Sequence, residues 1–127
     1  MKTILVDAIN GLVLEDGSML MPMHELLESY PNIKLVLTGA NDKQFQYFKL
    51  NELPYEVFTL KHNPEKTDPQ YFKILFEKYR LTPNEVVYFE HNMVAVETAK
   101  SEGINTYFYD HTKEDMDALK QYLDKNL

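Results

Sequence analysis

The sequence predicts an α/β domain in which helices cover both faces of a five-stranded parallel sheet. Short apolar runs, typical of strands buried on both faces, recur along the chain. Segments with apolar residues at helical spacing separate these runs, so strand and helix alternate five times. No repeat, linker or domain boundary interrupts the alternation. We therefore expect one domain over residues 1–127, with a three-layer, Rossmann-like architecture.

The predicted strands are apolar segments rich in β-branched and aromatic residues. In chain order they cover residues 4–6, 33–37, 55–60, 86–89 and 105–109. The first of them, Ile4-Leu5-Val6, is continuous and apolar and ends at Asp7. An ionisable residue directly after a buried strand is a candidate functional residue.

Each strand is followed by a helix that carries a recognisable start or stop signal. Pro22 stands in the first turn of a helix expected over 22–30, a position that suits proline. The later signals are Asn41-Asp42 and Asp68-Pro69 as helix starts, Gly103 as a helix end and Thr112 as the start of the last helix.

Composition excludes several classes of partner and chemistry. The chain has 13 Lys+Arg against 20 Asp+Glu, a formal charge of -7, and its lysines are scattered, so nucleic acid and anionic membranes are poor partners. The absence of cysteine excludes disulfides, thiolate catalysis and Cys-based metal sites. We see no signal peptide and no apolar run near the ~20 residues of a membrane span, and we expect a cytoplasmic protein.

Parallel sheets of this type bind ligands at the carboxyl ends of their strands. The residues at those ends are Asp7, Thr38, the segment after Leu60, Glu90 and Asp110. We therefore expect a functional site to be built from some of these residues, with Asp110 in a loop role.

Four of these strand ends resemble, in order, the motifs of the haloacid dehalogenase (HAD) superfamily. Asp7 is similar to the family's nucleophilic aspartate, and Thr38-Gly39 to its Ser/Thr position. Residues 66–72 (KTDPQYF) look like its "KPDP…F" segment, and residues 86–92 (VVYFEHN) like its "vvFIDDs" strand end. The resemblance covers nearly the whole chain, and four motifs in order are far more specific than any one alone.

The resemblance implies phosphoryl chemistry. An aspartate of this kind, here Asp7, attacks a phosphoryl group and forms an acylphosphate that water cleaves. Thr38, Gly39 and Lys66 would hold the phosphoryl oxygens of a small phosphorylated substrate. Mg²⁺, or Mn²⁺ in its place, would be the cofactor. The positions expected around the metal ion are Asp7, Ile9, Glu90 and His91.

The sequence departs from the family pattern in its acid and metal positions. The second aspartate, two residues after the first, is Ile9, which cannot carry a proton. In a register shifted by one residue, Asn10-Gly11 takes that place, and Asn10 can orient a water. General acid–base help is worth ~10²–10⁴-fold, so phosphatase activity without it should be slow. His91 stands where the family has an oxygen ligand. A nitrogen ligand at this position also suits Mn²⁺ or Zn²⁺.

The segments in which HAD proteins often insert a lid, or cap domain, are short here. Only residues 8–21 follow the first strand and only 61–67 follow the third, so we expect no cap. An open site of this kind would be closed by a partner protein or another subunit.

Two functions from different classes remain. The first is a weak, metal-dependent HAD-like phosphohydrolase, with a dehalogenase as the weaker alternative on these motifs. The second is a non-catalytic pseudoenzyme that binds a phosphorylated ligand or a protein partner. A receiver domain is rejected, because its phospho-accepting aspartate follows the third strand, which here ends at Leu60-Lys61.

Lys61 is the competitor of Lys66 for the lysine position. Three other side chains show no metal-ligand spacing and are expected at the surface: His24, His62 and His111.

Overall fold

The computed structural model describes residues 1–127 and shows strands and helices in the predicted alternation. The strands are β1 (Thr3–Asp7), β2 (Lys34–Thr38), β3 (Glu56–Thr59), β4 (Val86–Glu90) and β5 (Asn105–Phe108). The helices are α1 (Met21–Glu28), α2 (Asp42–Tyr47), α3 (Pro69–Tyr79), α4 (Met93–Ser101) and α5 (Met116–Asn126), with 3₁₀ turns at Leu50–Glu52 and Pro83–Glu85. None of these helices has the length and apolar character needed to cross a membrane.

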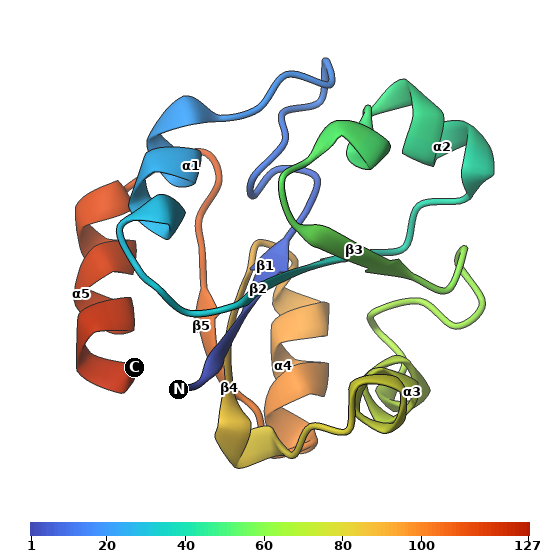
Figure 1. Cartoon of the computed structure of the whole chain (residues 1–127). Coiled ribbons are helices and arrows are strands. Elements are labelled where there is room, and N and C mark those ends of the chain that lie inside the picture. The colour runs from blue at the N-terminus through green and yellow to red at the C-terminus, as the bar shows by residue number, and fades with distance from the viewer.

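The strands form one sheet in the order β3-β2-β1-β4-β5, and every neighbouring pair is parallel (Figure 1). The chain therefore builds outward from β1 to one edge and then returns to place β4 on the other side of β1. Open α/β sheets bind ligands at such a switch point, outside the carboxyl ends of the strands. Receiver domains have the order 2-1-3-4-5 instead, which agrees with rejecting that fold.

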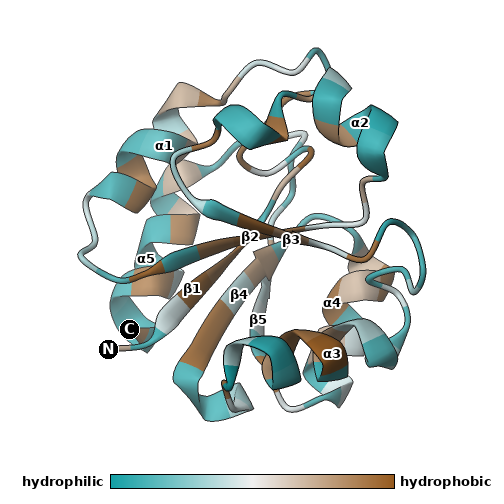
Figure 2. Cartoon of the chain, turned by 45° about the vertical axis from the view of Figure 1, so that its right-hand side comes forward, coloured by the Kyte–Doolittle hydropathy of each residue, from teal (hydrophilic) through white to brown (hydrophobic).

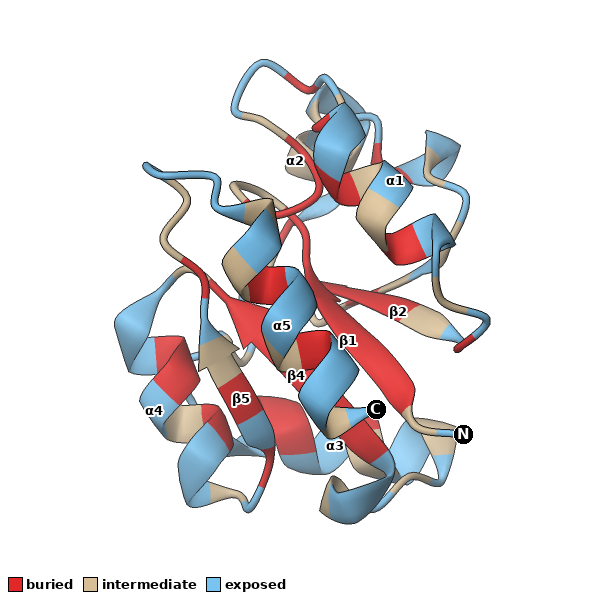
Figure 3. Cartoon of the chain, turned by 90° about the vertical axis from the view of Figure 1, so that its left-hand side faces the viewer, coloured by how far each residue is buried: buried red, intermediate tan, exposed pale blue.

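Two hydrophobic cores lie on the two faces of the sheet, because alternate strand residues point to opposite faces. Ile4 and Val6 of β1 pack with α1 and α5, whereas Leu5 packs with α3 and α4. Figure 2 shows hydrophobic residues concentrated in β1, β2 and β4, and Figure 3 shows β1 buried along its whole length. The predicted three-layer fold is confirmed.

The connection between β1 and α1 is a compact loop that packs on the core. Leu12 and Val13 in this loop are buried, and their backbone N–H groups donate to Asp7 O and Ala8 O. The connection between β3 and α3 is a short loop as well. Neither connection holds an inserted domain, so the prediction that the chain has no cap in these positions is confirmed.

Two predicted helix boundaries were wrong. The first helix ends at Glu28 and not at residue 30, and Tyr30 instead hydrogen-bonds to Asp124 of α5. Thr112 does not start the last helix, because its N–H and hydroxyl both donate to the Asp110 side chain and form a separate turn. Asp115 is the N-cap, and its side chain accepts from Ala118 N at 3.0 Å.

Gly11 allows the chain to turn sharply after Asp7. A Cβ atom on Gly11 would lie 2.2 Å from the carbonyl oxygen of Asp7, a distance at which backbone must move. We predict that Gly11→Ala lowers the free energy of unfolding by about 1–3 kcal/mol, the range seen for overpacked sites. Urea denaturation measures this change. Gln121→Ala, on the exposed side of α5, is the control and should change stability little. Equal stabilities of the two variants would contradict the prediction.

Candidate functional site

A pocket of about 280 Å³ lies at the carboxyl ends of β1, β2 and β4, at the switch point of the sheet. The structure brings together there nearly all of the predicted site residues. Those that line the pocket are Asp7, Ile9, Thr38, Gly39, Lys66, Glu90 and His91. Residues that are up to 84 positions apart in sequence therefore meet at one edge of the sheet, as in the contact of His91 with Asp7.

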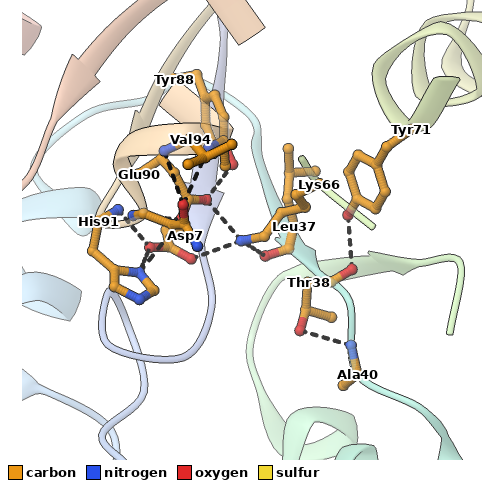
Figure 4. Close-up of polar contacts among 12 residues, drawn as sticks. Asp7, Leu37, Thr38, Ala40, Lys66, Tyr71, Tyr88, Glu90, His91 and Val94 are labelled. Atoms are coloured by element: carbon orange, nitrogen blue, oxygen red, sulfur yellow. Dashed lines mark hydrogen bonds and ion pairs between the residues drawn. The ribbon is translucent and has the colours of Figure 1, made fainter. Parts of the chain in front are cut away.

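The centre of the site is the ammonium group of Lys66, which lies between two buried carboxylates (Figure 4). Lys66 Nζ donates to Asp7 Oδ1 at 2.9 Å and to Glu90 Oε1 at 2.7 Å. The carboxylate side chains are only 1% and 0% exposed, respectively. Asp7 ends β1 and Glu90 ends the adjacent β4, so the sheet itself fixes the two acids side by side.

His91 holds the other oxygen of Asp7. Its backbone N–H donates to Asp7 Oδ2 at 2.9 Å, and its ring Nδ1 also contacts that oxygen. The same Nδ1 lies 3.4 Å from Glu90 Oε2. Both oxygens of Asp7 therefore have cationic or N–H partners, and the carboxylate is held in a fixed orientation.

These contacts separate the pKa values of the two acids. Burial by itself would raise the pKa of Asp7, but the charge of Lys66 and the hydrogen bond from His91 outweigh it and hold that pKa at about 2. Burial and the nearby charge of Asp7 raise the pKa of Glu90 above its usual value. Burial would lower the pKa of Lys66, yet the charges of Asp7 and Glu90 raise it. Asp7 is thus ionised at neutral pH.

The β2 end supplies the part of the pocket expected to hold an oxyanion. Thr38 is buried, and its Oγ1 accepts a hydrogen bond from Ala40 N at 3.1 Å. This leaves the hydroxyl hydrogen of Thr38 free to donate to a ligand. Tyr71 of α3 donates to the Thr38 carbonyl at 2.8 Å, which fixes the end of β2. Gly39 follows directly and lines the pocket.

No family model and no curated protein matches the chain. Solved structures do match it. One is a HAD family enzyme from Bacteroides thetaiotaomicron in complex with magnesium, with TM-score 0.64 and 22% identity over 78% of this chain and 56% of that chain. A hydrolase from Streptococcus pneumoniae TIGR4 matches with TM-score 0.62 and 17% identity over 91% of this chain and 59% of that one. A dehalogenase matches with TM-score 0.58 and 24% identity over 70% and 43%.

The chain has the HAD-like fold. The resemblance that the motifs indicated is thereby confirmed at the level of the fold. The chain spans about half of the length of the Bacteroides enzyme, which has also been solved as a mutant bound to magnesium and inorganic phosphate.

Asn10 is the predicted site residue that the HAD-like fold does not bring into this pocket. Its backbone has a φ of 68°, and its side chain points to Glu15 at 3.4 Å in a separate depression next to His111. The expectation that Asn10 orients a water beside Asp7 is therefore corrected. Ile9 does line the pocket, but its apolar side chain offers neither a proton nor a metal ligand.

Lys66, and not Lys61, is the lysine of the site. Lys61 is 60% exposed and pairs with Asp42 at the surface.

Sequence reasoning missed three residues. The hydroxyl of the buried Tyr88 donates to Glu90 Oε1, and the ring of His111 packs against His91 at 4.9 Å between centroids. His62 is exposed, as expected, and it also lines the pocket. For Tyr88, the alternation of side chains in β4 was an available signal, because Tyr88 and Glu90 point to the same face.

The acid side of the pocket offers ligands for a divalent ion. One atom each from Asp7, Glu90 and His91 lie within 4.8 Å of one another. Two carboxylates and one imidazole suit an ion that accepts nitrogen, such as Mn²⁺ or Zn²⁺, better than Mg²⁺, which prefers oxygen. Binding would also require His91 Nδ1 to give up its contact with Asp7. The residues therefore fit a divalent ion, with Mg²⁺ at a disadvantage.

We predict that Lys66→Met lowers the free energy of unfolding by about 3–5 kcal/mol, because removing one partner leaves buried charge uncompensated. The double variant Lys66→Met/Glu90→Gln should recover part of this loss, since it removes one of the two carboxylate charges. Urea denaturation provides the measurement.

The matched control is Lys61→Met, which breaks an exposed ion pair and should change stability little. A similar effect of Lys61→Met and Lys66→Met would show that the buried cluster does not contribute the predicted stabilisation.

Proposed function

We propose that the protein is a phosphohydrolase of low activity that acts through an aspartyl-phosphate on Asp7. The observation that carries the proposal is the Asp7 carboxylate, which is ionised, fixed in orientation and faces a pocket with the hydroxyl of Thr38. A carboxylate nucleophile needs its pKa well below neutral and a nearby positive charge, because the substrate is itself an anion. Lys66 supplies that charge.

Each side chain has a distinct part in the proposed reaction. Thr38 donates its hydroxyl hydrogen to a phosphoryl oxygen, and Gly39 lines the pocket next to Thr38. Lys66 offsets the repulsion between Asp7 and the phosphoryl oxygens, while His91 N–H keeps Asp7 in position. A divalent ion held by Asp7, Glu90 and His91 would supply further charge neutralisation when bound.

The low activity follows from Ile9. No side chain two residues after Asp7 can give a proton to the leaving group, and Asn10 points away from the pocket. Loss of general acid–base help costs ~10²–10⁴-fold. The pocket is also open to solvent, because the connections after β1 and β3 hold no inserted cap.

A second candidate, a non-catalytic protein that binds a small phosphorylated molecule or a protein partner over the open pocket, has one observation in its favour. Both oxygens of Asp7 are already engaged, Oδ1 by Lys66 and Oδ2 by His91. Attack on phosphorus requires one of them to become available. Turnover that depends on Asp7 distinguishes the two candidates.

We predict that Asp7→Asn lowers the turnover of p-nitrophenyl phosphate by at least about 10³-fold, because removing a covalent nucleophile costs this much or more. Purified protein is assayed with Mg²⁺ and with Mn²⁺, and the acylphosphate is trapped with hydroxylamine. Asp42→Asn, which changes an exposed acid, is the control and should retain wild-type turnover. Wild-type turnover no faster than that of Asp7→Asn would reject the enzyme and favour the binding protein.

We also predict that the protein binds Mn²⁺ more tightly than Mg²⁺, and that His91→Asp narrows the difference. The substitution replaces a nitrogen donor by a carboxylate, which suits Mg²⁺. Isothermal titration calorimetry of both ions against both proteins measures the ratio of dissociation constants. A ratio that does not change in His91→Asp would mean that His91 is not a ligand.

A further inference from the structure

We propose that His62, oriented by Glu65, is the general acid and base of the site, in the role that Ile9 cannot fill. The inference rests on the proposed phosphohydrolase function and assigns it one further catalytic residue. It depends on where the loop after β3 places this histidine, on the partners of its ring, and on the strained backbone that holds it there.

His62 lines the same pocket as Asp7 and Thr38, although it lies far from them in sequence. It approaches from the β3 side, whereas His91 approaches from the β4 side. A Cβ atom placed on Gly39 would lie 3.3 Å from His62 Nδ1 and 3.0 Å from Glu65 Oε2. The His62–Glu65 pair therefore packs directly on the turn that follows Thr38, where the phosphoryl group is expected.

Both ring nitrogens of His62 face oxygen atoms. Nδ1 lies 2.7 Å from Glu65 Oε1, and Nε2 lies 2.5 Å from Gln44 Oε1. The orientation of the Gln44 amide is set by Asn41, whose backbone N–H donates to the same Oε1 at 3.0 Å. His62 is thus the donor to Gln44, which also lines the pocket, and its Nε2–H must leave Gln44 Oε1 before it can reach a leaving group. The carboxylate at Nδ1 fixes the ring, as in other carboxylate-oriented catalytic histidines.

The loop holds His62 at a conformational cost. Lys61 and His62 have φ values of 55° and 65°, the left-handed region that side chains disfavour. Thr59 anchors this turn, because its Oγ1 donates to Ala40 O at 2.6 Å and accepts from Lys61 N at 3.0 Å. The hydrogen bond from Thr59 to Ala40 joins this loop to the segment after β2. The position of His62 relative to Thr38 is therefore fixed.

His91 is engaged with Asp7 instead. Its Nδ1 contacts Asp7, the nucleophile itself, and also faces Glu90. His62 makes no contact with Asp7, and its ring partners are Glu65 and Gln44. An ordinary surface pair between His62 and Glu65 would explain the ion pair, but not the position of the ring in the pocket beside Gly39.

The proposed steps balance. Asp7 attacks phosphorus, the bond from phosphorus to the leaving oxygen breaks, and the proton of His62 Nε2 passes to that oxygen to give an alcohol. The neutral imidazole then takes a proton from water as the water oxygen attacks the phosphorus of the acylphosphate. The bond to Asp7 breaks, which releases hydrogen phosphate and restores the Asp7 carboxylate and protonated His62.

The test compares two substrates that differ in their need for a proton. p-Nitrophenolate leaves without protonation, whereas the alkoxide of glycerol phosphate does not. His62→Gln should lower kcat/KM for glycerol phosphate by ~10²-fold or more, the usual worth of a general acid, and change kcat/KM for p-nitrophenyl phosphate far less. Because the variant also lacks the base, acylphosphate should accumulate with either substrate. Glu65→Gln should show the same pattern with a smaller loss.

His24→Gln, on α1 outside the pocket, is the matched control and should leave both substrates unaffected. Thermal melts of each variant check the fold. An equal loss on both substrates in folded His62→Gln would overturn the role of His62 while Asp7-dependent turnover still stands. If the wild-type protein shows no turnover that depends on Asp7, both the proposed function and the role of His62 are rejected.

Discussion

The buried ammonium of Lys66 is the interaction on which the rest of the site depends. β1 and β4 are neighbours, and each ends in an acid, so the sheet brings two carboxylates together away from water. Two such charges repel strongly in a medium of low dielectric. Lys66 compensates both at hydrogen-bond distance, and this allows Asp7 to stay ionised inside the protein.

This charge balance also affects how the site would hold a divalent ion. Two carboxylates usually call for a cation. Here Lys66 and His91 supply much of the compensating charge from the protein itself, since contact with Asp7 outweighs burial and raises the pKa of His91. A divalent ion must then compete with His91 for Asp7. Such an ion is also less necessary for offsetting the repulsion between the two carboxylates.

The pocket has two sides with different chemistry. The β4 side, with Glu90 and His91, fixes Asp7 in orientation. On the β3 side, His62 and Glu65 transfer the proton in our proposal. Thr38 and Gly39 lie between them at the end of β2. In this proposal, the short loop after β3 supplies the acid–base pair, because Ile9 stands where the HAD motif has its second aspartate.

The sequence by itself determined the α/β class, the order of the elements and the strand-end positions of Asp7, Thr38 and Glu90, because apolar periodicity and turn residues are local signals. Lys66 was predicted through a motif, and the tertiary structure separated it from Lys61 by burying only one of them. Only the tertiary structure decided that His62 lines the pocket, that His91 binds Asp7 and that Asn10 points away. Those three positions depend on backbone φ values and on contacts between residues distant in sequence, which no local pattern encodes.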